Sequence, residues 1–160
     1  MTTGRQWSYG ESPYYFAYGS NMNPERMAVR GLRHVSAEGA RLHGYELVFD
    51  KVSQAHPTSA HANIRVRPGA IVEGVLYHLG NLTAIEGLDR FERTPINYSR
   101  ELFAVHTQAG EAIWTWTYVA NPAVRGVSLA PEREYLDHLL AGRDFLSPAY
   151  GAMLERVRTR

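Results

Sequence analysis

The chain has 160 residues, of which 44% are hydrophobic and 21% charged, and these values are typical of one globular domain. It contains no cysteine, which excludes a disulfide scaffold, a cysteine nucleophile, a zinc ribbon and an iron–sulfur cluster. A net charge of +1 creates no field that attracts nucleic acid, and no apolar run reaches the roughly 20 residues of a membrane span. We therefore expect no nucleic acid and no membrane among its partners. The polar residues 1–12 predict a flexible lead-in to a single domain over 13–160, and the lack of a signal-peptide core predicts a cytoplasmic protein.

The first predicted elements are a strand, a tight turn and a short helix. An aromatic-rich run over 14–18 indicates a buried strand, and it ends at Gly19-Ser20-Asn21. Asn23 suits the N-cap of a following helix, Pro24 suits its first position, and the helix should end near Gly31.

The rest of the chain alternates strands with further short helices. The patterns predict strands over 37–50, 62–67, 70–79, 98–106 and 111–120, and helices over 82–91, 131–141 and from 148 onward. Residues 51–61 are polar and aperiodic, which predicts a mobile loop, and Pro68-Gly69 predicts a turn between two strands. Short helices mixed with antiparallel strand pairs favour an α+β fold with a curved or barrel-like sheet.

The strand over 111–120 carries aromatic side chains on alternate residues. Trp114, Trp116 and Tyr118 alternate with smaller residues, so the strand has two different faces. Aromatic side chains in such a row can stack on nucleic-acid bases, but only with a basic background that this chain lacks. We therefore interpret Trp114, Trp116 and Tyr118, together with Tyr98, as core residues.

The turn from Tyr18 to Met22 is the first candidate site. A strand that ends in Gly-Ser-Asn just before a helix leaves backbone N–H groups unpaired, and such groups can hold a carboxylate or a developing oxyanion. Gly19 would let a ligand approach the backbone closely. The alternative, which spacing alone favours, is a structural corner in which Asn21 and Asn23 are local caps.

The second candidate is a pair of carboxylates near the end of the helix over 82–91. Asp89 and Glu92 are three residues apart and share one helical face. Phe91 would place Glu92 at the edge of the core, where apolar surroundings raise the pKa of a carboxyl and suit it to proton transfer near neutral pH. The alternative is a solvated acidic face paired with neighbouring arginines.

No motif indicates a metal or an organic cofactor, and we expect neither. None of the seven histidines lies in an HExxH pair, and His56 and His61 are interpreted as residues of a solvated loop. The sequence has no P-loop and no GxGxxG motif, and Ser20 does not lie in a GxSxG elbow.

A series of motifs, in this order, resembles the γ-glutamylcyclotransferase family, which includes the AIG2-like proteins. The matching segments are FAYGSNM over 16–22, PER over 24–26, GVLY over 74–77, LDRFE over 88–92, Tyr98, Tyr135 and LLAG over 139–142. They extend over roughly residues 14–142. The resemblance implies a small mixed β-barrel with short helices packed around it.

The family's reaction cyclises the glutamyl part of a γ-glutamyl amine or γ-glutamyl amino acid to 5-oxoproline and releases the free amine. By resemblance, Glu92 is the catalytic acid/base. The implied substrate-binding residues are Tyr18, Gly19, Ser20, Asn21, Met22, Asn63, Tyr98 and Tyr135. The implied partner is a small-molecule γ-glutamyl substrate, and we expect a monomer or a homodimer that uses no cofactor and no metal.

One position departs from the family pattern, and two other functions stay open. Many members have glycine directly after the catalytic glutamate, whereas this chain has Arg93, whose charge is expected to favour the ionised form of Glu92. The first alternative is an enzyme that removes γ-glutamyl from a larger acylated metabolite. The second is a non-catalytic protein on the same scaffold that binds a γ-glutamyl group or an acid.

Overall fold

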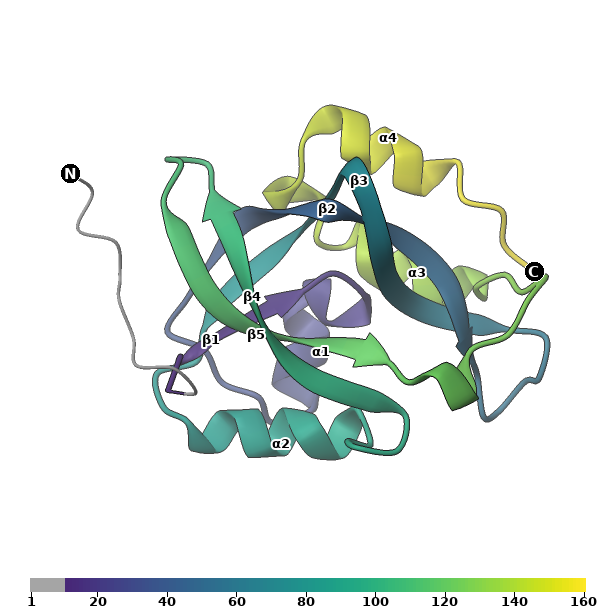
Figure 1. The fold of residues 1–160 in the computed structure, drawn as a ribbon, viewed down its shortest axis with the longest axis horizontal. Coiled ribbons are helices and arrows are strands. Elements are labelled where there is room, and N and C mark those ends of the chain that lie inside the picture. The colour runs from purple at the N-terminus through teal and green to yellow at the C-terminus, as the bar shows by residue number, and fades with distance from the viewer. Residues whose placement is uncertain (1–10) are drawn as a thin grey trace.

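The computed structural model of the protein describes residues 11–160 (Figure 1). Its strands are β1 (Tyr14–Ala17), β2 (Ser36–Val52), β3 (Ala60–His78), β4 (Tyr98–Thr107) and β5 (Ala112–Ala120). Its α-helices are α1 (Pro24–Val29), α2 (Thr83–Phe91), α3 (Arg133–Leu140) and α4 (Pro148–Glu155), and 3₁₀ turns cover Ser20–Met22, Pro122–Val124 and Arg143–Phe145.

The strands close into a barrel in the order β1-β3-β2-β4-β5. Four of the five strand contacts are antiparallel, and β1 meets β5 in parallel. Helices α3 and α4 lie beside each other, away from α2, so short helices surround the barrel (Figure 1). The predicted α+β fold with a small mixed, barrel-like sheet is therefore confirmed.

Strand β1 is buried on both of its faces, which explains its unbroken aromatic run. Tyr14 and Phe16 belong to a cluster whose buried members include residues of all five strands, and this cluster fills the barrel. Tyr15 and Ala17 point the other way and pack with residues of α1, α2 and α3. The strand thus carries the chain through the core directly into the turn that follows it.

The helix boundaries agree with the capping residues of the sequence. The side chain of Asn23 accepts a hydrogen bond from the Glu25 N–H at the start of α1. Asn81 does the same for the Ala84 N–H at the start of α2, at 3.1 Å. Helix α1 ends at Val29, two residues before Gly31, whose φ of 72° places it in the left-handed region.

The turn predicted at Pro68-Gly69 is wrong, because β3 continues through it from Ala60 to His78. Gly69 has a φ of 84°, and Gly44 in the neighbouring β2 has a φ of 85°. The β2–β3 register shifts between His43 and Tyr45, so the two glycines lie in a paired irregularity of two long strands. A Pro-Gly dipeptide bends the sheet here without reversing the chain.

The loop predicted over 51–61 is shorter than expected. Strand β2 extends to Val52 and β3 begins at Ala60, which leaves 53–59 as the connection. Lys51 lies opposite His61 in the β2–β3 ladder. Both ends of the predicted loop are therefore fixed in the sheet.

The two faces of β5 are reversed relative to the prediction. Trp114 is 54% exposed and Trp116 is half-buried, whereas Thr115 and Thr117 are fully buried. The alternation is present, but the smaller side chains face the crowded barrel interior. Tyr118 is the exception among the three aromatic residues and is buried as expected.

The predicted N-terminal lead-in overlaps the described residues only at 11 and 12, and residues 1–10 lie outside them. Ser12 is already buried, and its hydroxyl donates to the carbonyl of Trp114 at 2.6 Å. In residues 11–160, no helix has the length and apolar character needed to cross a membrane.

Candidate active site

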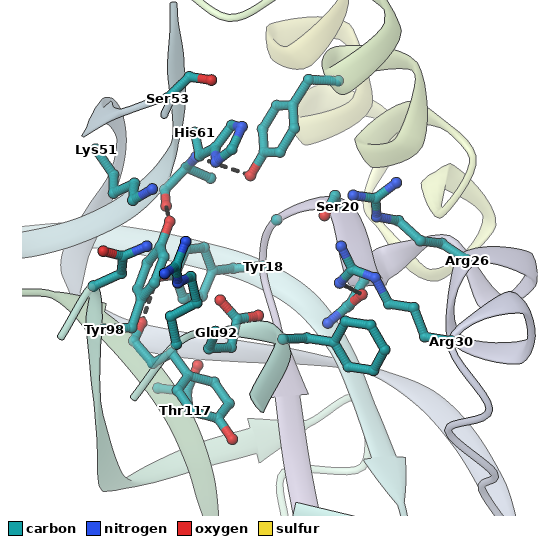
Figure 2. A pocket seen from close by; sticks show the side chains of 18 of the residues that line it. Tyr18, Ser20, Arg26, Arg30, Lys51, Ser53, His61, Glu92, Tyr98 and Thr117 are labelled. Carbon is teal, nitrogen blue, oxygen red and sulfur yellow. Dashed lines mark hydrogen bonds between the residues drawn. The ribbon is translucent and has the colours of Figure 1, made fainter. Parts of the chain in front are cut away.

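A cavity of about 350 Å³ opens where the turn after β1, the end of α2 and the 51–62 segment meet (Figure 2). Of the nine residues expected at the site, seven line this cavity: Tyr18, Gly19, Ser20, Asn21, Glu92, Tyr98 and Tyr135. The two candidate motifs, which are more than 65 residues apart in the sequence, therefore share one cavity.

Met22 and Asn63 do not line the cavity, and both are fully buried. The Asn63 amide donates to the Asp50 carboxylate and accepts from the Ala120 N–H, each at 2.9 Å. These bonds tie β3 to β2 and β5. Asn63 therefore supports the barrel, Met22 packs in the cluster that Tyr15 and Ala17 share with the helices, and neither contributes to the cavity wall.

The turn after β1 is held rigidly while part of its backbone stays unbonded. Tyr77 donates to the Asn21 carbonyl at 2.7 Å, and Arg30 donates to the Asn21 side chain at 2.8 Å. The Met22 N–H returns to the Gly19 carbonyl at 3.0 Å. The N–H groups of Gly19 and Asn21 donate to no group of residues 11–160, so the turn offers donors to a ligand.

Two tyrosines are positioned by the backbone of Ala62 on β3. The Tyr98 hydroxyl donates to the Ala62 carbonyl, and the Tyr135 hydroxyl accepts from the Ala62 N–H, each at 2.9 Å. Burial raises the pKa of Tyr135 to about 12, so its hydroxyl is neutral at physiological pH. Because it accepts from Ala62, the Tyr135 O–H proton is left to donate to a ligand.

Glu92 lies at the C-terminal end of α2 and is only partly exposed. Burial raises the pKa of Glu92 to about 7, although the nearby Arg30, Lys51 and Arg26 act in the opposite direction. A carboxyl with this pKa exists in both protonation states near neutral pH. It can therefore accept a proton and return it within one reaction cycle.

The positive charge that favours the ionised form of Glu92, expected from Arg93, comes instead from other cations. Arg93 is exposed and donates to the side chain of Gln54, while the charges that favour ionised Glu92 belong to Arg30, Lys51 and Arg26. The φ of Arg93 is 52°, in the left-handed region. This conformation gives the physical reason why glycine suits the position after the glutamate.

The raised pKa predicts that Glu92→Gln changes stability in a pH-dependent way. A carboxyl whose pKa is about 7 in the folded protein, against 4.5 ordinarily, carries no ionisation penalty below pH 4.5. The penalty grows as the pH rises from 4.5 to 7 and reaches at most about 3 kcal/mol. Since glutamine is neutral, the variant should melt above the parent near pH 8 and together with it near pH 4. Thermal unfolding at both pH values measures this, and a difference that does not change with pH would contradict it.

Several cavity residues were missed by the sequence analysis. Arg26 in α1 and Arg30, which caps the C-terminal end of that helix, both line the cavity. Their spacing of four residues is typical of side chains on one helical face, which is a signal that the sequence contains. His61 was interpreted as solvated, but it is stacked on Tyr135 with ring centroids 4.7 Å apart. Burial lowers the pKa of His61 to about 4, so the ring is neutral at physiological pH.

The closed mixed barrel, with a backbone turn and a partly buried carboxylate at one cavity, has the fold of the γ-glutamyl cyclotransferases. A solved structure titled gamma-glutamyl cyclotransferase matches with a TM-score of 0.80 and 29% identity, over 94% of this chain and 90% of that one. An uncharacterized protein from Homo sapiens matches with a TM-score of 0.81, 29% identity and the same coverage. YkqA from Bacillus subtilis, at 24% identity and a TM-score of 0.80, shares the fold over 94% of this chain and 56% of its own.

The family model for gamma-glutamyl cyclotransferase, AIG2-like, matches residues 15–137. The chain therefore belongs to the AIG2-like γ-glutamyl cyclotransferase family. The comparison with curated proteins returned no match.

Proposed function

We propose that this protein is a γ-glutamylcyclotransferase that converts a γ-glutamyl amine or γ-glutamyl amino acid into 5-oxoproline and a free amine. The observation that carries the proposal is the position of Glu92, whose carboxyl lines the same cavity as the Gly19–Asn21 backbone. Burial raises the pKa of this carboxyl to about 7, which suits proton transfer under physiological conditions. Family membership supports the same conclusion.

The reaction needs no nucleophile from the protein. The α-amine of the glutamyl group attacks its own γ-carbonyl carbon, a five-membered ring closes, and the bond from that carbon to the departing nitrogen breaks. The α-ammonium has three protons and the lactam nitrogen of 5-oxoproline has one, so two protons must leave it. Ionised Glu92 takes the first proton before the attack and gives it to the departing nitrogen. The second proton, lost as the ring closes, passes through Glu92 to the same nitrogen, which leaves as an ammonium and returns Glu92 to its ionised form. Holding the glutamyl chain in the folded conformation contributes up to about 7–11 kcal/mol to lowering the barrier.

The groups around Glu92 suit the charges of the glutamyl part. Arg26 and Arg30 lie on one side of Glu92 and are placed to pair with the α-carboxylate (Figure 2). With the carboxylate held there, the N–H groups of Gly19 and Asn21 are free to stabilise the oxyanion that develops on the γ-carbonyl oxygen.

The internal nucleophile provides a direct test. Acetylating the α-nitrogen removes its basicity, so a γ-L-glutamyl amide should release 5-oxoproline whereas its N-acetyl form should release nothing. The measurement is amine and 5-oxoproline release from the two compounds at matched concentrations, over a panel of γ-glutamyl amines and amino acids. Equal amine release from both forms would identify water as the nucleophile and the protein as a hydrolase. No release from any γ-glutamyl compound would overturn the proposal.

A further inference from the structure

Lys51 is the only lysine in the sequence, and it is buried in the wall of the cavity. The other sixteen basic residues are arginines, whereas a lysine ordinarily lies on the protein surface. Lys51 is 3% exposed and lies in β2, one residue before the strand ends, opposite His61. Its aliphatic stem is enclosed, and its nitrogen is directed toward the cavity (Figure 2).

The Lys51 ammonium has no ion pair and no hydrogen bond within the described part of the chain. Its closest described interaction is with the ring of Tyr98, whose centroid lies 5.9 Å from Nζ. Burial lowers the pKa of Lys51, Glu92 opposes this effect, and Arg93 adds to it. An enclosed ammonium that makes no ion pair or hydrogen bond destabilises a fold, so a binding role for the charge explains its presence better than a structural one.

The charges around Glu92 form two separate groups. Arg26 comes from α1 and Arg30 directly follows this helix, and both lie on one side of Glu92, whereas Lys51 comes from β2 and lies on the other (Figure 2). The glutamyl part of a substrate carries one carboxylate and one ammonium, and the arginine pair satisfies that carboxylate. Lys51 then faces the part of the substrate that departs.

We infer that Lys51 binds an acidic group on the departing amine. The preferred substrates are γ-glutamyl conjugates of amino acids or other amines that carry a carboxylate near the departing nitrogen, rather than of plain alkylamines. This inference rests on the proposed function and narrows its substrate class. It makes Lys51 a specificity-determining residue that has no part in the proton transfers assigned to Glu92.

The test uses two substrates that differ only by one carboxylate, γ-L-glutamyl-L-alanine and γ-L-glutamyl-ethylamide. The parent should prefer the first by at least about 10-fold in kcat/KM, because the ammonium pairs with the alanyl carboxylate. Lys51→Met should reduce this preference to within about 3-fold, mainly by raising KM for γ-L-glutamyl-L-alanine. Lys51→Arg keeps the positive charge and should retain most of the preference.

Three results would count against the inference, and they are distinguishable. Equal kcat/KM for both substrates in the parent would overturn it while leaving the proposed function intact. An equal loss on both substrates in Lys51→Met would assign the lysine to the glutamyl half instead. If the parent cleaves neither substrate but cleaves other γ-glutamyl compounds of the panel, the inference alone fails, whereas no release from any γ-glutamyl compound overturns the proposed function as well.

Two further measurements show whether the lysine acts by binding. Since Lys51 makes no direct ion pair or hydrogen bond in the described residues, Lys51→Met should melt at the same temperature as the parent or above it. A marked decrease in melting temperature would indicate a structural role. Because the chain has one lysine, ¹³C,¹⁵N-lysine labelling of the parent gives one side-chain NMR signal. This measurement needs no variant, so it tests the inference even if Lys51→Met does not fold. In the parent, this signal should shift with L-alanine in the presence of 5-oxoproline and not with ethylamine, and the reverse pattern would overturn the inference.

Discussion

Replacing Glu92 with glutamine is expected to lower kcat by at least about 100-fold while the protein stays folded. The amide has nearly the same shape as the carboxylic acid but cannot take the proton that the α-ammonium must lose. Binding of 5-oxoproline should persist, because Arg26, Arg30 and the Gly19–Asn21 backbone are unchanged. The measurement is the rate of 5-oxoproline release by the purified variant, together with a titration of 5-oxoproline binding.

A matched control lies on the same helix. Glu86→Gln makes the same chemical change at an exposed position in the first turn of α2, and it should leave kcat within about 2-fold of the parent. Turnover by Glu92→Gln within a few-fold of the parent would remove Glu92 from the mechanism. Combined with the higher melting temperature expected near pH 8, loss of turnover would show that this carboxyl costs stability and serves catalysis.

The parts of the fold that could be predicted are those specified by local pattern. The cap Asn23 and the aromatic run of β1 each depend on a few neighbouring residues. The turn predicted at Pro68-Gly69 is wrong because the backbone conformations that a Pro-Gly dipeptide favours occur both in turns and in strand irregularities. What decides between the two is the pairing of this segment with β2, whose register shift lies at Gly44, 25 residues away in the chain.

Burial of particular side chains could not be predicted in the same way. Alternation in β5 showed that the strand has two faces, but closure of the barrel decides that Thr115 faces inward and Trp114 outward. Lys51 lies in a segment whose polar composition is typical of a loop. Its enclosure results from packing against Tyr98 and the other cavity walls, which come from distant parts of the chain.

In the candidate site, too, some features follow from the local sequence and others from packing. Motif position was enough to bring the Gly19–Asn21 turn and Glu92 together in one cavity. Motif position was not enough to predict that Met22 is buried in the core. It also did not predict that the Asn63 amide makes hydrogen bonds to Asp50 and Ala120 within the barrel. Direction of a side chain follows from the three-dimensional packing rather than from its neighbours in sequence.

Gly19→Val is expected to lower kcat/KM by about 100-fold or more through a change confined to the cavity. A φ of −111° is accessible to any residue, so the effect comes from the added side chain and not from backbone strain. A Cβ at position 19 would lie 3.1 Å from the Tyr135 hydroxyl and 3.3 Å from the Ala62 Cβ. The valine methyl groups must therefore displace Tyr135 or occupy the space beside the turn, and a displacement near 1 Å at a reacting centre can cost about 100-fold.

The stability cost of Gly19→Val should be small by comparison. Loss of the hydrogen bond from the Ala62 N–H to the Tyr135 hydroxyl accounts for about 1 kcal/mol. Gly151→Ala in α4 is the matched control, because a Cβ there meets no atom within 4 Å and the glycine lies far from the cavity. It should keep full activity and gain up to about 1 kcal/mol from helix propensity. The measurements are kcat/KM and the thermal unfolding temperature of both variants. If Gly19→Val retained the parent's kcat/KM, the close approach of substrate to the Gly19 backbone would be wrong, and the oxyanion would have to be stabilised by other donors.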